Sequence, residues 1–154
     1  MELESTIGLT LRDMGRALGQ RLMGGMVIIL RGELGAGKTS FSQGVAEGLN
    51  IILPVTSPTF ALIHLYEGGR LVLVHCDFYR LKSSQEALDI GFLEYQTPSN
   101  VVLVEWGEAF SELMPEDVLT LTMSYTAEGR KIHIAQVASK YQAIIDEWVQ
   151  ACQS

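Results

Sequence analysis

Residues 26–44 read MVIILRGELGAGKTSFSQG. The apolar run of residues 26–30 predicts a buried strand, and helix-forming sequence follows the glycines. Between the two lies the pattern G-x-x-x-x-G-K-[ST], in the strand–loop–helix context that a phosphate-binding loop requires. This stretch therefore predicts a site for a nucleoside triphosphate, and the rest of the chain is expected to be organised around it.

The residue types in this loop suit phosphate binding. Glycines let backbone N–H groups converge on phosphate oxygens, and the N-terminus of the following helix favours an anion. Lys38 can reach the β- and γ-phosphates, and the Thr39 hydroxyl can ligate Mg²⁺. A chance glycine-rich turn is the structural alternative, and the surrounding strand and helix argue against it. The expected nucleotide contacts are Gly32, Leu34, Gly35, Ala36, Gly37, Lys38, Thr39 and Ser40.

Length and charge narrow the class of protein. The 154 residues fit one domain, spanning residues 1–154, with enough chain for a core. The net charge is −7, the acidic residues are spread along the chain, and no basic stripe is present. Because binding to nucleic acid needs clustered lysine and arginine, a stand-alone RNA-binding protein is not expected. If the protein serves RNA, a partner holds the RNA.

The cysteines and the apolar runs bear on location. Cys76 and Cys152 lie far apart and match no metal-ligand spacing. Residues 1–15 are too polar for a signal peptide, and no apolar run approaches the length that spans a membrane. We therefore expect a soluble, cytoplasmic protein with reduced thiols and no membrane contact.

Helices are expected on both sides of the opening stretch. Thr10 is a candidate N-cap, with Asp13 in the first turn, for a helix whose apolar residues recur at helical spacing up to Leu22. The helix after the loop is expected to run to about Gly48 and to pack one apolar face on the sheet.

The next segments predict strands. Residues 60–66 and 71–76 are strand-like, and Gly68-Gly69 between them indicates an antiparallel hairpin. A short helix is expected near residues 84–88. Residues 101–105, four apolar residues ending in a carboxylate, are typical of a buried parallel strand.

The last third of the chain predicts a second hairpin and a final helix. Residues 119–123 and 131–134 alternate between apolar and polar residues. Ser139 with Gln142 matches a capping box at the start of a C-terminal helix. The fold class expected is α/β: a single-domain P-loop NTPase fold with a mixed, mainly parallel sheet flanked by helices and with inserted antiparallel hairpins.

Hydrolysis or transfer of a phosphoryl group also needs a second group on the metal. Glu105, at the end of its buried strand, is the candidate, because ligands lie beyond the carboxyl ends of parallel strands. The alternative is a solvent-facing Glu105. Asp77 either holds a metal-bound water or orients an attacking water, with Arg80 in contact with phosphate, or it pairs with Arg80 or caps a turn. Residues 56–59 either sense the γ-phosphate or form a capped turn.

Other polar and aromatic residues give weaker signals. His64, His75 and His133 lie in strand-like sequence and match no metal-ligand spacing, so structural roles are expected for them. Trp106 directly follows the candidate carboxylate, and it either packs in the core, lines the site or faces a partner.

Several motifs in series carry a family resemblance. The bacterial TsaE family is similar to this sequence over nearly the whole chain, in the order and spacing of four motifs and in Gly91-Phe92 between the third and fourth. The four motifs are residues 32–39, GELGAGKT; residues 57–60, SPTF; His75-x-Asp77-x-Tyr79-Arg80; and Val104-Glu105-Trp106.

The resemblance implies an ATPase subunit, using ATP and Mg²⁺ and releasing ADP, that works with TsaB and TsaD. That pathway installs N6-threonylcarbamoyladenosine at position 37 of tRNAs that read codons beginning with A. Hydrolysis in the family is thought to reset the TsaB–TsaD assembly, which mainly holds the tRNA. By motif position, Lys38 and Thr39 contact phosphate and Mg²⁺, and Glu105 lies near Mg²⁺. Asp77 and Trp106 are then residues needed for activity.

The base end of the site departs from the family pattern. The family commonly places a threonine four residues before the helix glycine, near the adenine. Leu11 occupies that place before Gly15, and Thr10 is one residue away. Arg130, after the Gly129 turn, resembles a family position near the base. Thr10 and Arg130 are therefore the base-side candidates.

Two other functions stay open at this point. A small-molecule kinase with the same loop needs an arginine-rich lid, for which the middle of the chain offers only Arg70, Arg80 and Lys82. A nucleotide-gated interaction module would bind ATP without turnover. No N-K-x-D sequence is present, which argues against a GTPase. We expect weak ATPase activity for the isolated protein, made productive by partners. The oligomeric state is not predicted.

Overall fold

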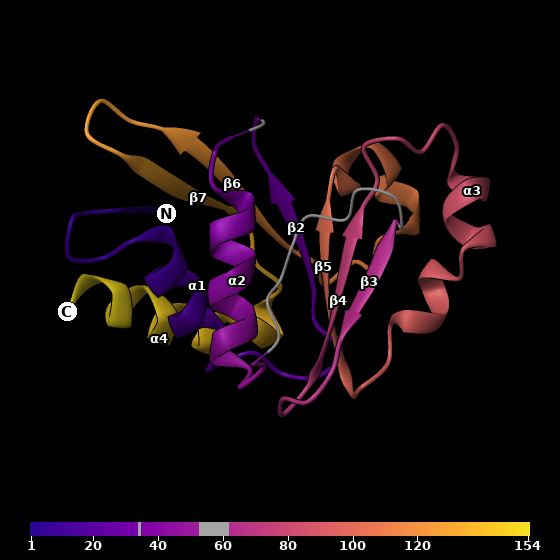
Figure 1. The fold of residues 1–154 in the computed structure, drawn as a ribbon, viewed down its shortest axis with the longest axis horizontal. Coiled ribbons are helices and arrows are strands. Elements are labelled where there is room, and N and C mark those ends of the chain that lie inside the picture. The colour runs from indigo at the N-terminus through magenta and orange to yellow at the C-terminus, as the bar shows by residue number, and fades with distance from the viewer. Residues whose placement is uncertain (34, 53–61) are drawn as a thin grey trace.

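A computed structural model describes residues 1–33, 35–52 and 62–154. Leu34 and the expected loop of residues 56–59 lie outside the described residues. Within the described part, seven strands form one sheet in the order β1-β7-β6-β2-β5-β4-β3 (Figure 1). The strands are β1 (Glu2–Glu4), β2 (Val27–Arg31), β3 (Ile63–Tyr66), β4 (Val72–Asp77), β5 (Asn100–Glu105), β6 (Leu119–Tyr125) and β7 (Arg130–Gln136).

The centre of the sheet is parallel and its two sides are antiparallel. Strand β2 pairs in parallel with β5 and β6, and β5 pairs in parallel with β4. Strand β3 forms a hairpin with β4, and β7 forms one with β6. The predicted mixed α/β sheet with two inserted hairpins is therefore confirmed. The N-terminal strand β1, which pairs with β7, was not predicted, because it is short and only Leu3 of its residues is buried.

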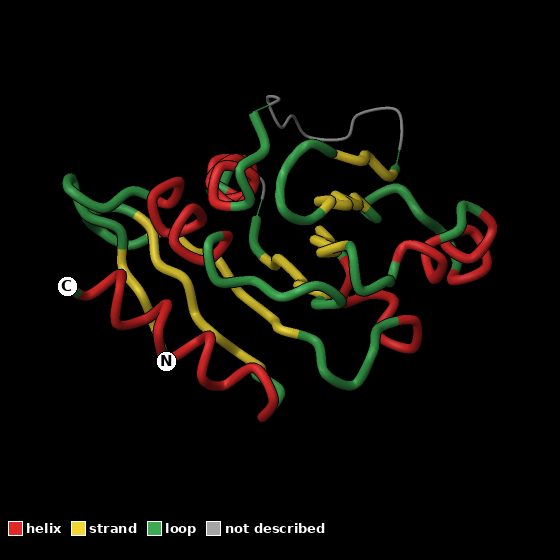
Figure 2. The backbone as a smooth tube through the Cα atoms, turned by 90° about the horizontal axis from the view of Figure 1, so that it is seen from below, coloured by secondary structure: helices red, strands yellow, loops and turns green. Residues whose placement is uncertain are grey.

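The helices gather at the β6–β7 side of the sheet. Helices α1 and α2 lie there with α4 and both chain ends, whereas α3 lies at the opposite, β3 end (Figure 1, Figure 2). The helices are α1 (Leu11–Gly19), α2 (Lys38–Gly48), α3 (Ser84–Asp89) and α4 (Gln142–Gln153), and the short 3-10 turns are η1 (Phe92–Tyr95), η2 (Gly107–Leu113) and η3 (Ser139–Tyr141). In the part of the chain that the structure describes, no helix is long and apolar enough to span a membrane.

The core has a layer on each face of the sheet. Ile28 and Leu30 of β2 face the layer that α1, α2 and α4 cover, and Val27 and Ile29 face the other layer. This alternation is the period of two expected of a strand that is buried on both faces. The buried indole of Trp148 in α4 donates a hydrogen bond to the Met14 carbonyl of α1 (2.9 Å), which joins the C-terminal helix to the helix layer.

Helices α1 and α2 lie so close that their backbones touch. A Cβ atom at Gly15 would collide with the Phe41 carbonyl oxygen, and one at Gly44 would collide with the Arg12 carbonyl oxygen. Glycine is therefore required at both positions, since the only way to fit a side chain is to separate the helices. This packing fixes α2, the helix that follows the glycine loop, against the rest of the fold.

One of the two predicted helix caps is correct. Thr10 and Asp13 form the capping box of α1, with the Asp13 N–H donating to Thr10 Oγ1 (3.1 Å). The capping box of Ser139 and Gln142 is wrong, because residues 139–141 form η3 and no side chain caps α4 at Tyr141. The Tyr141 ring is buried in the core. A cap contributes about 1 kcal/mol, less than burying an aromatic ring, so packing sets where the helix begins.

Candidate nucleotide-binding site

The site is built on the loop between β2 and α2. Gly32, Gly35 and Gly37 have φ angles of 146°, 81° and 101°, a region that strains any residue with a side chain. The Ala36 N–H donates to the Glu33 carbonyl (3.1 Å), which tightens the loop. The glycines of the sequence motif therefore form a compact turn that ends at the N-terminus of α2, where backbone N–H groups suit an anion.

Lys38, the first residue of α2, lies at the centre of the site. Its side chain is only 6% exposed, and its ammonium group donates to the Gly32 carbonyl oxygen (2.8 Å). The same Nζ atom lies 3.7 Å from Glu105 Oε1 and 4.7 Å from the centroid of the Trp106 ring. A buried charge is costly unless it is paired, and these three contacts supply that pairing.

Glu105 ends β5 and reaches the start of the glycine loop. It is in register with Leu30 of β2, the strand that leads into the loop, and its side chain is buried. One carboxylate oxygen faces Lys38, and the other lies 2.7 Å from His75 Nε2. The carboxylate is therefore at the carboxyl end of the parallel strands, where ligands of α/β sheets bind. Its role as a metal contact stays a prediction.

His75 belongs to this cluster, although its sequence context predicted only a structural role and no contact with Glu105. Its ring is fully buried on β4, and its Nδ1 has no hydrogen-bond partner among the described residues. Since an ionised carboxylate only accepts hydrogen bonds, Nε2–H is the donor to Glu105. The spacing of His75 and Asp77 could have indicated this contact. Residues two apart in a strand share a face, and Asp77 is the register partner of Glu105 on the neighbouring strand, so His75 lies on the same face.

The pKa values of the two carboxyl groups of the site, Glu105 and Asp77, are shifted in opposite directions. Burial is the largest influence on Glu105 and would raise its pKa, but the hydrogen bond from His75 and the charges of His75 and Lys38 outweigh it and leave the pKa below its ordinary value. The pKa of Asp77 is raised, mainly by burial and also by the charge of Glu105, against the effect of a backbone hydrogen bond from Tyr79. The surroundings therefore favour the charged form of Glu105 and disfavour that of Asp77.

Asp77 caps a turn. Its Oδ1 accepts a hydrogen bond from the Tyr79 N–H (3.0 Å), and the Phe78 N–H next to it donates to the Glu105 carbonyl (3.0 Å). Among the described residues, no ion pair joins Asp77 and Arg80. Of the alternatives left open by the sequence, the turn cap is present, and it places Asp77 beside the cluster of Lys38 and Glu105.

Trp106 belongs to the site as well as to the packing. It has a φ angle of 64°, which is strained for a bulky side chain at a cost of about 1–3 kcal/mol. This conformation turns the chain sharply after β5, and the ring contacts the Lys38 ammonium and the Tyr79 ring. The strain therefore coincides with a position that aims an indole at the buried lysine.

The side chains predicted for the base end lie apart from this cluster. Thr10 is engaged in the cap of α1, with its hydroxyl donating to Asp13 (3.0 Å). The guanidinium of Arg130 lies over the Tyr125 ring, 4.0 Å from its centroid, and the Tyr125 hydroxyl donates to the Gly35 carbonyl (2.6 Å). The β6–β7 hairpin therefore reaches the glycine loop through Tyr125, a residue that the sequence analysis did not single out.

The remaining predicted contacts lie in and beside the first turn of α2. Ala36 is buried, Thr39 is half-buried and Ser40 is exposed. Leu11 fills the space beside Gly37, where a Cβ atom would meet its Cδ1. A hydrophobic side chain therefore packs next to the loop at this position.

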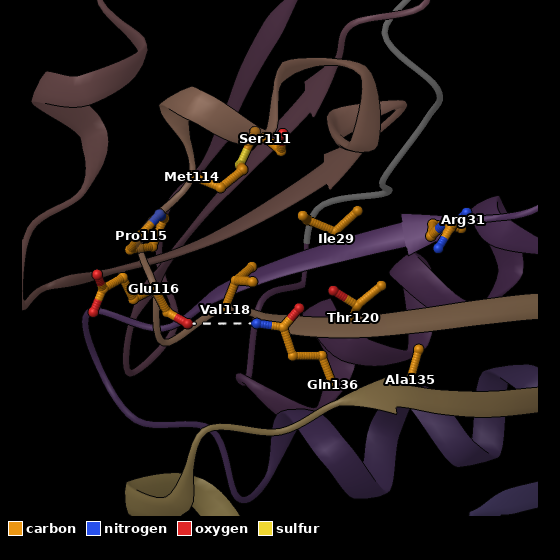
Figure 3. A pocket seen from close by; sticks show the side chains of 10 residues that line it. All are labelled: Ile29, Arg31, Ser111, Met114, Pro115, Glu116, Val118, Thr120, Ala135 and Gln136. Atoms are coloured by element: carbon orange, nitrogen blue, oxygen red, sulfur yellow. Dashed lines mark hydrogen bonds between the residues drawn. The ribbon is translucent and has the colours of Figure 1, made fainter.

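Among the described residues, the cavities outside the Lys38–Glu105 cluster include two that the β6–β7 hairpin helps to line. One, of about 800 Å³, is lined by residues 4–8 and 126–128, next to the hydrogen bonds that join the Ser5 hydroxyl to the backbone of Arg130. The other, of about 490 Å³, lies beside Ile29 and Thr120, and the Gln136 amide donates to the Glu116 carbonyl at its rim (Figure 3). The first cavity adjoins Arg130, a predicted base-side residue, and the second is lined by Arg31, which precedes the glycine loop.

Comparison with known protein families assigns the chain to a family. Residues 9–132 match the sequence model of the family described as "Threonylcarbamoyl adenosine biosynthesis protein TsaE". The chain belongs to the TsaE family. The match runs from the start of α1 into β7 and so includes the glycine loop, His75, Asp77 and Glu105.

Individual TsaE relatives agree with this assignment. The "tRNA threonylcarbamoyladenosine biosynthesis protein TsaE" of Treponema pallidum is 43% identical over 79% of this chain and 90% of its own length. The protein of the same name from Bacillus subtilis is 40% identical over 80% of this chain and 77% of its own. The crystal structure of Bacillus subtilis YdiB superposes with a TM-score of 0.80, at 28% identity, over 98% of this chain and 95% of that one.

Proposed function

We propose that this protein binds ATP with Mg²⁺ and hydrolyses it in support of the biosynthesis of threonylcarbamoyladenosine in tRNA. Membership in the TsaE family supports the pathway. The observation that carries the hydrolytic step is the buried contact of Lys38 with Glu105, at the mouth of the glycine loop. A cation for the phosphates and an ionised carboxylate for the metal are the two charges that hydrolysis at such a loop needs.

The loop and Lys38 act on the phosphates. The N–H groups at the start of α2 and the Lys38 ammonium neutralise the β- and γ-phosphates. The hydrogen bond from Lys38 to the Gly32 carbonyl keeps the ammonium at the loop before a nucleotide arrives. Because the side chain is held in place, little of its conformational entropy remains to be lost on binding.

The residues present fit a magnesium ion. Mg²⁺ takes oxygen ligands and is held by one or two carboxylates or hydroxyls together with substrate phosphates. The pKa of Glu105 lies below its ordinary value, so its carboxylate is ionised at neutral pH. Thr39 is the second residue of α2, directly after Lys38. Within the described residues, no group of three or more His, Cys, Asp and Glu side chains forms a complete metal cage. We therefore propose that Thr39 and Glu105 hold the ion, which neutralises charge on the phosphates.

We further propose that the protein works in the cytoplasm as the partner of a TsaB–TsaD complex, which holds the tRNA. The net charge of −7 supports this division of labour, because an acidic surface repels the RNA backbone. Modification at position 37 of tRNAs that read ANN codons is the product expected of the complete system.

The test is phosphate release measured with and without purified TsaB and TsaD. We expect slow hydrolysis by the isolated protein, faster hydrolysis with the partners, and none for Lys38→Ala. Lys82→Ala is the matched control, because this lysine is exposed and lies outside the cluster. Equal rates with and without partners, and no joint elution on a sizing column, would contradict the partner-dependent function.

The same experiment separates the other candidates. Tight nucleotide binding with no phosphate release under any condition would identify a nucleotide-gated interaction module. Transfer of the γ-phosphate to a small molecule would identify a kinase. Reconstitution of modified tRNA from all components, with this protein omitted or carrying Lys38→Ala, then tests the pathway.

A further inference from the structure

Tyr79 is an aromatic residue beside the site, and core packing does not account for it. The side chain is 58% exposed, yet its ring centroid lies 4.9 Å from that of Trp106, at an interplanar angle of 50°. A large exposed aromatic side chain gains little from burial, so this specific ring contact is the feature to account for.

The backbone around Tyr79 is fixed at two points. The Tyr79 N–H donates to Asp77 Oδ1, and the Phe78 N–H donates to the Glu105 carbonyl. The Phe78 side chain is buried, with its ring 4.9 Å from that of Phe92. The turn after β4 therefore holds the Tyr79 ring at a set place beside the end of β5.

Trp106 needs such a support. It is only half-buried and has a left-handed backbone conformation, and its ring lies over the Lys38 ammonium. An indole that turned outward would remove one of the three contacts of the ammonium and leave that side of it open to water. The Tyr79 ring occupies the neighbouring space and so restricts the indole.

We propose that Tyr79 is a positioning residue that holds the Trp106 indole over the Lys38 ammonium, so that the lysine is oriented for phosphoryl chemistry. This inference rests on the proposed ATPase function for its kinetic part, but the ring contact itself does not depend on it. It also gives Asp77 a second task, because the Asp77 turn cap places the Tyr79 ring. Tyr79 itself touches no reacting atom.

The test combines tryptophan fluorescence with kinetics on the full chain. The protein contains two tryptophans, and Trp148 is fully buried, so the difference between the wild type and Trp106→Phe isolates the Trp106 signal. In Tyr79→Ala without nucleotide, we expect the Trp106 emission to shift to longer wavelength and acrylamide to quench it more strongly. Tyr79→Phe keeps the ring and restores both values.

In the kinetic arm, we expect kcat of Tyr79→Ala to fall by about threefold to tenfold, the range that the loss of one aromatic pair supports, with KM for ATP nearly unchanged. Tyr79→Phe is expected to retain the wild-type kcat. Leu93→Ala is the matched control, because it removes another exposed apolar side chain, 48% exposed, from the surface. Unchanged melting temperatures show that the variants fold.

The two arms separate two failures. Wild-type emission and quenching in Tyr79→Ala would overturn the positioning role, whatever the ATPase rate. A changed Trp106 signal in a protein that never hydrolyses ATP would instead overturn the proposed function and leave the ring contact standing. A drop in kcat of the same size in Leu93→Ala would also overturn the inference, because the effect would not be specific to the ring.

Discussion

The two ends of the candidate nucleotide site are held in different ways. At the phosphate end, Lys38 and His75 are buried, and each contacts the buried Glu105. His75 and Glu105 lie on the parallel strands β4 and β5, and Lys38 starts α2. At the proposed base end, Tyr125 is 51% exposed, and the guanidinium of Arg130, its neighbour across the β6–β7 hairpin, lies over its ring. Buried charges lose most when a partner is removed, whereas exposed contacts are worth little. Substitutions should therefore have large effects at the phosphate end and small ones at the base end.

The largest effect is expected for Lys38→Ala. Removal of the ammonium takes away a charged hydrogen-bond donor to phosphate, which is worth about 1.5–3 kcal/mol for each bond. The variant also leaves Glu105 without its buried cation. We expect ATP binding to weaken by at least about 100-fold. Titration calorimetry with ATP and Mg²⁺ checks this, and Lys82→Ala should bind like the wild type. Tight binding by Lys38→Ala would place the phosphates elsewhere.

The next effect is expected for Glu105→Gln. The amide keeps the shape of the side chain but removes the charge that is proposed to hold Mg²⁺. We expect hydrolysis to fall by about 100-fold, the size typical when one preorganised electrostatic group is lost, while ATP affinity without metal changes little. Rates over a series of Mg²⁺ concentrations measure this. Unchanged Mg²⁺-dependent hydrolysis would rule out the metal role of Glu105.

A third prediction concerns stability at the phosphate end. His75→Ala removes the buried donor to Glu105 and leaves a cavity beside an unpaired carboxylate oxygen. We expect a loss of about 2–4 kcal/mol in the free energy of unfolding, measured by urea denaturation. His133→Ala is the control. His133 is exposed, and its contact with Glu2, at 3.7 Å, lies at the surface, so the substitution should cost less than about 1 kcal/mol. Equal losses in both variants would mean that the buried bond adds nothing.

The pH dependence of stability follows from Glu105. Its pKa in the folded protein lies below the ordinary value of 4.5, so the ionised form stabilises the fold. That stability is present above about pH 4.5 and is lost as the pH falls through the lower pKa of the folded state. The advantage of the wild type over Glu105→Gln in unfolding free energy should therefore shrink as the pH falls from about 5 toward the acid limit of folding. A constant difference over this range would contradict the lowered pKa.

The smallest effects are expected at the base end. Arg130→Ala removes a partly exposed cation over an aromatic ring, worth about 0.5–1 kcal/mol, so we expect ATP affinity to fall by about twofold to fivefold. Tyr125→Phe removes the hydrogen bond to Gly35 and should have an effect of similar size. Competition with a fluorescent nucleotide measures both. A loss as large as that of Lys38→Ala would show that the two ends are equally important.

The same contrast explains what the sequence could predict. The glycine loop, Lys38 and the carboxylate at the end of β5 are recognisable because their geometry is set by neighbouring residues and by where strands end. The bond of His75 to Glu105 was not predicted, because it depends on the pairing of β4 with β5, which brings together residues 30 positions apart. Tyr125 was not predicted to reach the loop, because its hydrogen-bond partner Gly35 lies 90 positions away in the sequence.

The wrong helix cap has a different cause. Local hydrogen-bonding patterns predicted that α4 begins at Ser139, but the burial of Tyr141 sets the path of the chain. Local preferences contribute less free energy than core packing does. They set where a helix begins only where packing does not, as at the exposed capping box of α1.

The pairing of β1 with β7 has a consequence for the order of assembly during synthesis. Residues 2–4 leave the ribosome first, but their partners are residues 131–133, so this edge of the sheet closes only when most of the chain has emerged. Ser5 joins the Arg130 backbone in the same late step. The phosphate end, made of residues 27–106, has all its parts earlier. A nascent chain can therefore form the lysine–carboxylate pair before the base end of the site exists.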